Sequence, residues 1–152
     1  MADPWDFSAG AVLTAAQLNE IGDAKTWTPV WTNLTIGNAT QTATYMVINN
    51  LCFYFLKVAL GSSSTVDGGS VACTTPVNTA VSSYQTGTCW LRPDGGVIYP
   101  ATTTCIANKI YLYSGYPVST GSYIRTANMT NLIPTTWDTD GEIYATGVYQ
   151  IA

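Results

Sequence analysis

Nine carboxylates are the side chains of this 152-residue chain that could act as paired acid–base groups or as metal ligands. Residues 138–142, Asp-Thr-Asp-Gly-Glu, have the opening spacing of an oxygen-rich calcium loop, but the later ligands and the terminal glutamate are missing. A turn leading into the last strand is the simpler interpretation. The other acids fall beside a short predicted helix or in turns, and no spacing selects the pair that glycoside hydrolysis requires. We therefore predict no catalytic residues and no metal site.

The chain contains no histidine, and its five Lys and Arg residues form no cluster. The absence of histidine excludes Ser-His and Cys-His nucleophile pairs and removes the commonest zinc ligand. The formal net charge is −4, whereas proteins that bind nucleic acids or anionic membranes carry clusters of basic residues. No glycine-rich phosphate loop precedes a helix. We predict a protein that is not an enzyme, holds no cofactor and binds no nucleic acid.

The four cysteines, Cys52, Cys73, Cys89 and Cys105, form no CxxC pair. Their even number would permit two disulfides in a secreted protein, in any of three connectivities. The N-terminus is acidic and lacks the positive region of a secretory signal, so we favour free thiols on buried strands.

Aromatic residues in or beside predicted loops are the remaining candidates for ligand contact. Tyr84, Tyr99, Tyr116 and Trp137 could stack on sugar rings, although packing in the core or at its rim is the commoner use of such residues. We take Tyr84, Tyr99 and Tyr116 as candidate receptor-facing residues, and the loops 61–69, 93–96 and 114–122 as the segments displayed outward.

The elements that must position these residues are short β-strands. Threonine occurs 24 times, beside ten Tyr and five Trp, and β-branched and aromatic residues favour strands over helices. Apolar runs separated by turn signals predict strands at 27–36, 39–48, 51–60, 70–73, 87–91, 97–99, 105–113 and 142–151, with a further one in 77–84. Asn49–Asn50 suits a tight hairpin, and 93–96, Pro-Asp-Gly-Gly, suits a turn. We predict an all-β antiparallel sandwich or jelly roll over residues 25–152.

Residues 1–24 form a separate N-terminal segment with one short helix. Thr14 and Gln17 form a capping box at its start, and Gly22 ends it. A helix over 15–21 is too short to be stable alone, so it must dock. The segment either covers its own domain or attaches to another protein, through the apolar residues Trp5, Phe7, Val12, Leu13, Leu18 and Ile21. The longest apolar run, 51–60, is too short to span a membrane.

The predicted strand 51–60 is apolar on both faces. Cys52, Tyr54, Leu56, Val58 and Leu60 lie on one face, and Leu51, Phe53, Phe55, Lys57 and Ala59 on the other. A strand with one solvated side should alternate polar and apolar residues, so the second face needs cover from a loop, the N-terminal segment or another copy. The low charge content favours another copy. We predict a homo-oligomer with Leu51, Phe53 and Phe55 at the interface.

Both ends of the chain resemble a known group of proteins. The N-terminal motifs are FSAGAVLTAAQLN at 7–19 and WTPVWTNLTIGN at 27–38, and the C-terminal motif is PTTWDTDGEIYATGVY at 134–149. These motifs are similar to the helix, the strand that follows it and the closing stretch of minor tail and fibre proteins of tailed bacteriophages. The interior of the chain is similar to these proteins only in the pattern of its predicted strands.

The resemblance implies a virion structural protein, assembled in the bacterial cytoplasm. An N-terminal element would join other virion proteins, and a β domain, commonly trimeric, would project toward a host-surface glycan or protein. Placement on the tail or as a capsid-decorating head fibre stays open. Two other classes also remain: a stand-alone carbohydrate-binding module, and a small hydrolase acting through two clustered carboxylates.

Overall fold

The computed structural model describes residues 12, 14, 22–80, 85–117 and 124–152. These residues contain twelve strands and no helix, so the all-β prediction is confirmed. The predicted helix over 15–21 lies outside the described residues. The strands are β1 Lys25–Thr26, β2 Trp31–Thr32, β3 Leu34–Thr35, β4 Thr40–Ile48, β5 Leu51–Ala59, β6 Thr65–Val66, β7 Ala72–Thr74, β8 Gln85–Arg92, β9 Tyr99–Ile106, β10 Lys109–Pro117, β11 Ile124–Asn128 and β12 Glu142–Gln150.

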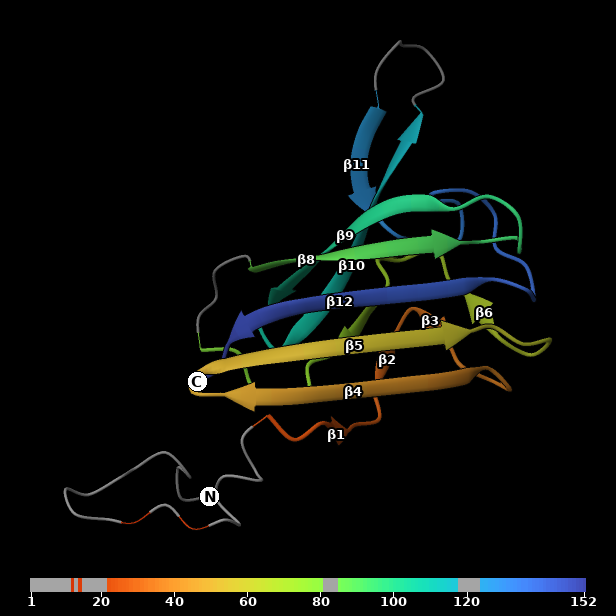
Figure 1. Ribbon diagram of the computed structural model, residues 1–152. Coiled ribbons are helices and arrows are strands. Elements are labelled where there is room, and N and C mark those ends of the chain that lie inside the picture. Colours follow the sequence, from red (N-terminus) through yellow and green to blue (C-terminus); the bar gives the residue numbers. More distant parts are fainter. Residues whose placement is uncertain (1–11, 13, 15–21, 81–84, 118–123) are drawn as a thin grey trace.

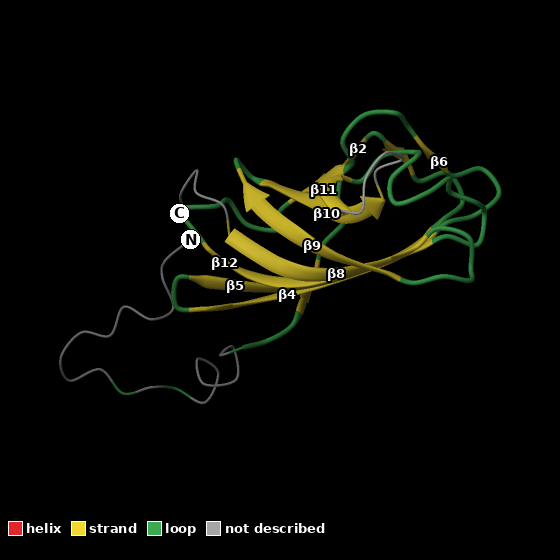
Figure 2. Cartoon of the chain, turned by 90° about the horizontal axis from the view of Figure 1, so that it is seen from above, coloured by secondary structure: helices red, strands yellow, loops and turns green. Residues whose placement is uncertain are grey.

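Ten of these strands form one continuous antiparallel sheet in the order β1-β4-β5-β12-β8-β9-β10-β7-β2, with β11 paired to β10 (Figure 1). β3 and β6 form a separate two-stranded sheet. The large sheet bends between β8 and β10 and curls over its own core (Figure 2). The predicted arrangement of two stacked sheets is therefore corrected to a single curled sheet. Both arrangements bury one face of every strand, so they share the same alternation of residues.

Residues 25–32 connect the two edges of the curled sheet. β1 pairs with β4 at one edge, and β2 pairs with β7 at the other. The Trp27 N–H donates to the Ala43 carbonyl at 3.1 Å, and the Thr74 N–H donates to the Val30 carbonyl at 3.0 Å. Asn33, with a φ of 57°, then interrupts the strand predicted for 27–36, so that β2 and β3 join different sheets.

The long strands around β5 follow the predicted boundaries closely. β4 and β5 form a nine-residue ladder closed by the tight Asn49–Asn50 turn, and Asn49 has the left-handed φ of 58° that such turns require. β12 pairs with the other edge of β5 over nine residues. The strand predicted for 105–113 is two strands, because a turn at Ala107–Asn108 divides β9 from β10.

The inner face of the sheet forms the core. Cys52, Tyr54, Leu56 and Val58 alternate along β5 and are all buried. All four cysteines are free and buried, on β5, β7, β8 and β9, which confirms the prediction of free thiols on buried strands. Burial raises the pKa of the Cys89 thiol to about 12 and that of the Cys105 thiol to about 11. These thiols are inert in the folded protein.

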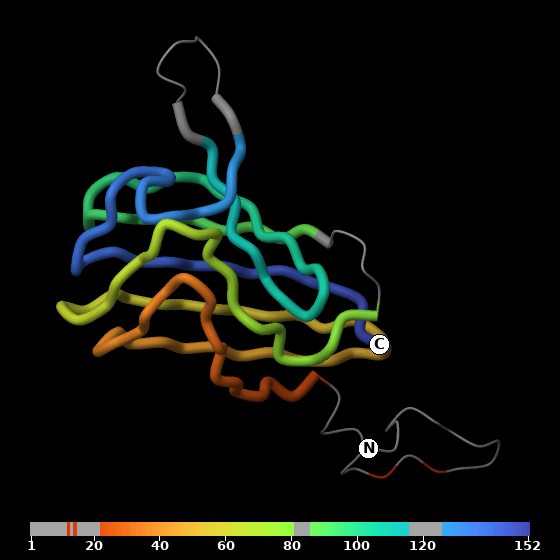
Figure 3. Tube along the Cα trace, turned by 180° about the vertical axis from the view of Figure 1, so that it is seen from behind, coloured from red at the N-terminus to blue at the C-terminus, as the bar shows by residue number. Residues whose placement is uncertain are grey.

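The three longest central strands, β4, β5 and β12, give the domain two distinct ends, about 30 Å apart at ~3.4 Å per residue. The proximal end holds the Asn49–Asn50 turn and the C-terminus, where the Ile151 N–H donates to the Asn50 carbonyl at 2.9 Å. Gly22 approaches Ile48 at this end. The distal end holds the turns that follow β5 and β8 and the turn that precedes β12 (Figure 3). Within the described ranges, no helix has the length and hydropathy needed to cross a bilayer.

Candidate functional surfaces

The outer face of the sheet carries an uncovered row of apolar side chains. Phe53 and Phe55 are 38% and 42% exposed, although they alternate with core residues that are almost completely buried. Phe53 lies opposite Val148 of β12, and Leu51 lies opposite Ile48 of β4. We call these five side chains the outer apolar face: Ile48, Leu51, Phe53, Phe55 and Val148. The second face of β5 is therefore left partly open to solvent by the residues that the structure describes.

An aromatic stack adjoins this face on the next two strands. Tyr144 of β12 and Trp90 of β8 are register partners, and their ring centroids lie 3.7 Å apart at an interplanar angle of 16°. The Lys57 ammonium lies 4.9 Å from the centre of the Tyr144 ring. Contact with the Tyr144 side chain is the main cause of the raised pKa of Lys57. A small hollow of about 150 Å³ lies between Phe55 and the stacked rings.

The charges beside the stack are paired with one another. Glu142 forms an ion pair with Arg92 and lies 3.9 Å from the Lys57 ammonium. Pairs this close to the surface contribute little to folding, because water screens them. Lys57 and Arg92 share the single carboxylate of Glu142, so this group beside Tyr144 and Trp90 carries a net charge of +1. The outer apolar face itself contains no charged residue, and the group with a net charge of +1 lies at its border.

The structure brings together the three residues predicted for the subunit interface, Leu51, Phe53 and Phe55, on the outer apolar face. Sequence reasoning missed Ile48, Val148 and the Trp90–Tyr144 stack. The alternation of apolar residues along β12 was the available signal for Val148. Of the predicted attachment residues Trp5, Phe7, Val12, Leu13, Leu18 and Ile21, only Val12 is described, and it is 87% exposed.

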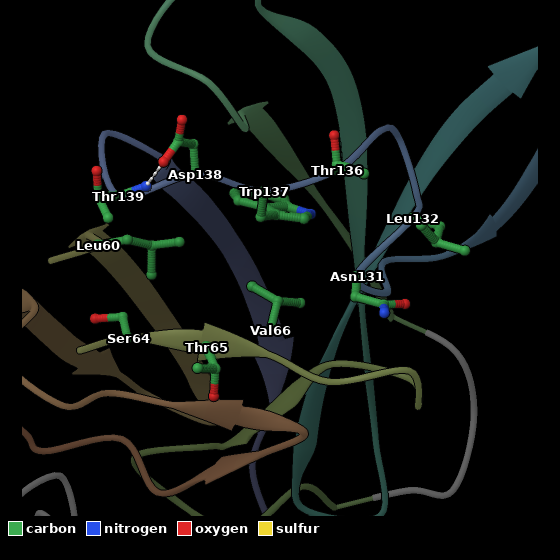
Figure 4. Close-up of a pocket in the computed structure, with 10 residues that line it drawn as sticks. All are labelled: Leu60, Ser64, Thr65, Val66, Asn131, Leu132, Thr136, Trp137, Asp138 and Thr139. Atoms are coloured by element: carbon green, nitrogen blue, oxygen red, sulfur yellow. Dashed lines mark hydrogen bonds between the residues drawn. The ribbon is translucent and has the colours of Figure 1, made fainter. Parts of the chain in front are cut away.

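A pocket of about 360 Å³ opens at the distal end of the domain (Figure 4). It lies between the turn after β5, strand β6 and the stretch that precedes β12. Trp137 lies in the middle of the lining, with Leu60 and Ser64 to one side and Asn131 and Leu132 to the other. The complete lining is Leu60, Ser64, Thr65, Val66, Asn131, Leu132, Thr136, Trp137, Asp138 and Thr139. We call it the distal pocket.

Hydrogen bonds hold the two sides of the distal pocket together. The Asn131 N–H donates to the Asp67 carbonyl at 3.1 Å, and the Leu60 N–H donates to the Gly141 carbonyl at 2.8 Å. The Trp137 indole N–H donates to the Thr130 carbonyl at 3.1 Å, which fixes the ring. Asp138 accepts the Thr139 N–H at 2.6 Å and takes part in the turn before β12. Residues 138–141 thus form the predicted turn, and Glu142 begins β12.

The other predicted receptor-facing residues lie elsewhere. Tyr99 begins β9 and packs partly buried against the core, so its ring is only partly displayed. Tyr116 belongs to β10, opposite Arg125 of β11. Tyr84 lies outside the described residues. Of the predicted displayed loops, 61–69 and 93–96 lie at the distal end, whereas 114–122 begins inside β10 and then leaves the described range.

The polar groups inside the curled sheet are used for packing. The Tyr54 and Thr103 hydroxyls are hydrogen bonded at 2.6 Å, and the Cys105 thiol donates to the Tyr54 oxygen at 3.8 Å. Burial raises the pKa of the Tyr54 hydroxyl far above its usual range. Within the described ranges, no group of three or more His, Cys, Asp or Glu side chains is placed to hold a metal ion.

Comparisons with known proteins found no match: no protein-family model, no curated protein and no solved structure matches the chain.

Proposed function

We propose that this protein is a structural component of a bacteriophage particle. In this proposal, copies of the chain associate through the outer apolar face, as a trimer. The N-terminal segment joins each copy to another virion protein, and the distal end faces the host surface. The observation that carries the proposal is the outer apolar face, whose phenyl rings are about 40% exposed on an otherwise well-packed sheet.

Association through this face is favoured by the hydrophobic effect. Complete burial of a large apolar side chain is worth about 1.5–3 kcal/mol, and these side chains still have over a third of their surface to bury. Aromatic residues with few charges are also the composition typical of a subunit interface. The Lys57–Glu142–Arg92 group at the border carries a net charge of +1, and charged groups are typical of the solvated rim of an interface. Contiguous apolar surfaces are common at interaction sites.

The arrangement of the two ends supports attachment at one end and display at the other. The described chain enters the domain beside Ile48 at the proximal end. The turns and the distal pocket lie at the opposite end of β4, β5 and β12. A copy held through the N-terminal segment would direct its distal end away from the particle. The resemblance of the N-terminal and C-terminal motifs to phage tail and fibre proteins is the reason for naming a phage particle.

The association is tested by measuring the mass of the wild-type chain and of a Phe53→Ser, Phe55→Ser variant by light scattering. The wild-type chain should be a trimer at micromolar concentration. The variant should be a monomer with an unchanged β-sheet circular dichroism spectrum, because both substitutions lie outside the core.

The control removes two apolar side chains that are more exposed than Phe53 and Phe55 from another place. Val97 and Ile98, 56% and 55% exposed, lie in the segment between β8 and β9, so a Val97→Ser, Ile98→Ser variant should keep the wild-type mass. A folded wild-type monomer would overturn the association and would favour the N-terminal segment as the cover of this face. A trimer that survives the Phe53 and Phe55 changes would place the interface elsewhere.

Attachment is tested separately by deleting residues 1–22. The shortened chain should remain folded, because the first strand begins at Lys25, but should no longer be incorporated into particles. Retained incorporation would refute the N-terminal attachment. An image of the whole particle that locates the protein on the tail or on the capsid would decide between a tail fibre and a head fibre.

A further inference from the structure

We propose that the distal pocket binds a neutral saccharide, one pyranose ring at a time. The assignment of that saccharide to the host surface rests on the function proposed above, whereas the binding itself does not. The pocket volume of about 360 Å³ falls in the range of small-molecule sites, about 300–1,000 Å³.

The lining is chemically mixed in the way that a sugar requires. A pyranose ring has C–H faces that are apolar and an edge of hydroxyl groups that donate and accept hydrogen bonds. The Trp137 indole and the side chains of Val66 and Leu60 supply apolar surface. The exposed residues Thr65, Thr136 and Thr139 supply hydroxyls, and Asn131 supplies an amide that both donates and accepts.

The charge of the lining selects against anionic ligands. Asp138 is the only charged residue among those that line the pocket, and no Lys or Arg is present there. Phosphate, sulfate and carboxylate groups are bound in proteins mainly through Arg, Lys or clustered N–H groups. An uncharged, hydroxyl-rich ligand is therefore favoured over a nucleotide, an acidic peptide or an acidic sugar.

The pocket is also held open in a fixed shape. The Trp137 N–H is bonded to Thr130, and the two sides of the pocket are joined through Asn131 and Asp67. A ring that is fixed before binding loses little conformational entropy when a ligand stacks on it. The same indole N–H gives a spectroscopic signal that reports directly on the pocket.

The test uses the full-length chain labelled with ¹⁵N and follows the indole N–H signals of its five Trp residues. A Trp137→Phe variant assigns the pocket signal. Glucose, galactose, mannose and N-acetylglucosamine are added one at a time at millimolar concentrations, followed by their methyl glycosides. The Trp137 signal should shift and saturate with at least one neutral sugar. N-acetylneuraminic acid, which carries a carboxylate, should leave it unchanged.

Isosteric changes of the pocket hydroxyls test the contacts without disturbing the fold. Thr136→Val and Thr139→Val should each weaken binding about 5- to 10-fold, the equivalent of one lost hydrogen bond. Thr102→Val, an exposed position of β9 away from the pocket, is the matched control and should bind as the wild-type chain does.

Several results would overturn the proposal. One is the absence of a saturable shift with every neutral sugar. Another is an affinity of the Thr136 and Thr139 variants equal to that of the wild-type chain. A third is a shift with N-acetylneuraminic acid as large as the shift with a neutral sugar. Binding of free sugars with exclusion of their methyl glycosides would overturn the role at a host-surface glycan. Sugar binding by a monomeric chain would support the pocket and contradict the proposed trimer, so the two failures are distinguishable.

Discussion

The two faces of β5 contain side chains of similar hydrophobicity in very different surroundings. On the inner face, Leu56 and Val58 are completely buried, and Tyr54 donates to or accepts from Thr103 inside the core. On the outer face, Phe53 and Phe55 keep about 40% of their surface exposed. The inner face owes its burial to close packing by the curled sheet, and the outer face has no such partner among the described residues. Hydrophobicity alone therefore does not distinguish a buried core residue from an exposed one.

The close packing of the inner face is evident at Gly147 of β12, which contacts the Tyr54 side chain. A Cβ atom at this position would lie 2.6 Å from the Tyr54 hydroxyl oxygen and 2.8 Å from the ring. Only glycine allows the Tyr54 ring to lie against β12 and to reach Thr103. Phe53 and Phe55 keep more than a third of their surface exposed, so their substitutions should be felt in assembly and not in folding.

The largest expected contrast comes from two neighbours in the chain, Leu56 and Phe55. Leu56→Ala should lower the free energy of unfolding by about 2–5 kcal/mol, because it removes buried methyl groups and leaves a cavity. Phe55→Ala should lower it by only about 0.5 kcal/mol, as at other surface sites. Urea titrations of both variants, at a concentration low enough to keep the chain monomeric, measure the difference. Equal losses would mean that the outer face is already packed within a single copy.

A smaller effect is expected at Gly147. Gly147→Ala should lower the free energy of unfolding by about 1–3 kcal/mol, because the added methyl group forces the Tyr54 ring to move. Gly68→Ala is the control, since its Cβ atom would have no neighbour closer than 3.8 Å, and it should be nearly neutral. Thermal and urea unfolding curves provide the measurement. A neutral Gly147→Ala would show that the inner face is loosely packed.

The smallest effect is expected at Asp94, which lies on neither face. Hydrogen bonds from the N–H groups of Gly96 and Val97, at 3.0 and 3.3 Å, lower the pKa of this carboxyl below its ordinary value of 3.8. The ionised form therefore stabilises the turn above pH 3.8, and this stabilisation is lost as the pH falls through the lowered pKa.

Asp94→Asn should accordingly be slightly less stable than the wild-type chain at neutral pH, and the difference should shrink in acid. Urea midpoints measured at neutral pH and near pH 3 give both values. A difference that grows in acid would contradict this sign. The result supplies a baseline for a local turn contact against which the effects on the two faces are judged.

The sequence was sufficient to predict the long strands β4, β5 and β12 but not how they associate. β4, β5 and β12 were predicted because apolar runs and turn signals such as Asn49–Asn50 define them locally. The curled sheet was missed because alternation is identical whether the inner face packs on a second sheet or on the same sheet after it bends. The turn at Ala107–Asn108 was missed because Ala107 adopts a φ of 50°, a conformation that its residue type does not predict.

The same limit applies to the candidate sites. The two apolar faces of 51–60 were visible because they lie within one strand. The Trp90–Tyr144 stack depends on the register between β8 and β12. Neither segment's own sequence indicates that it pairs with the other. The distal pocket combines residues 60–66 with residues 131–139, which meet only through tertiary hydrogen bonds. Trp137 was predicted as a candidate for sugar stacking, but its partners in the pocket were not.

The enclosure of all four native thiols has a practical consequence. Maleimide reagents require an accessible thiolate, which none of these buried cysteines offers in the folded chain. A single cysteine introduced at the exposed Thr139 would therefore be the one position that such a reagent modifies. A gold cluster or fluorophore coupled there would mark the distal end of each copy in an intact particle without replacing any natural residue of the core.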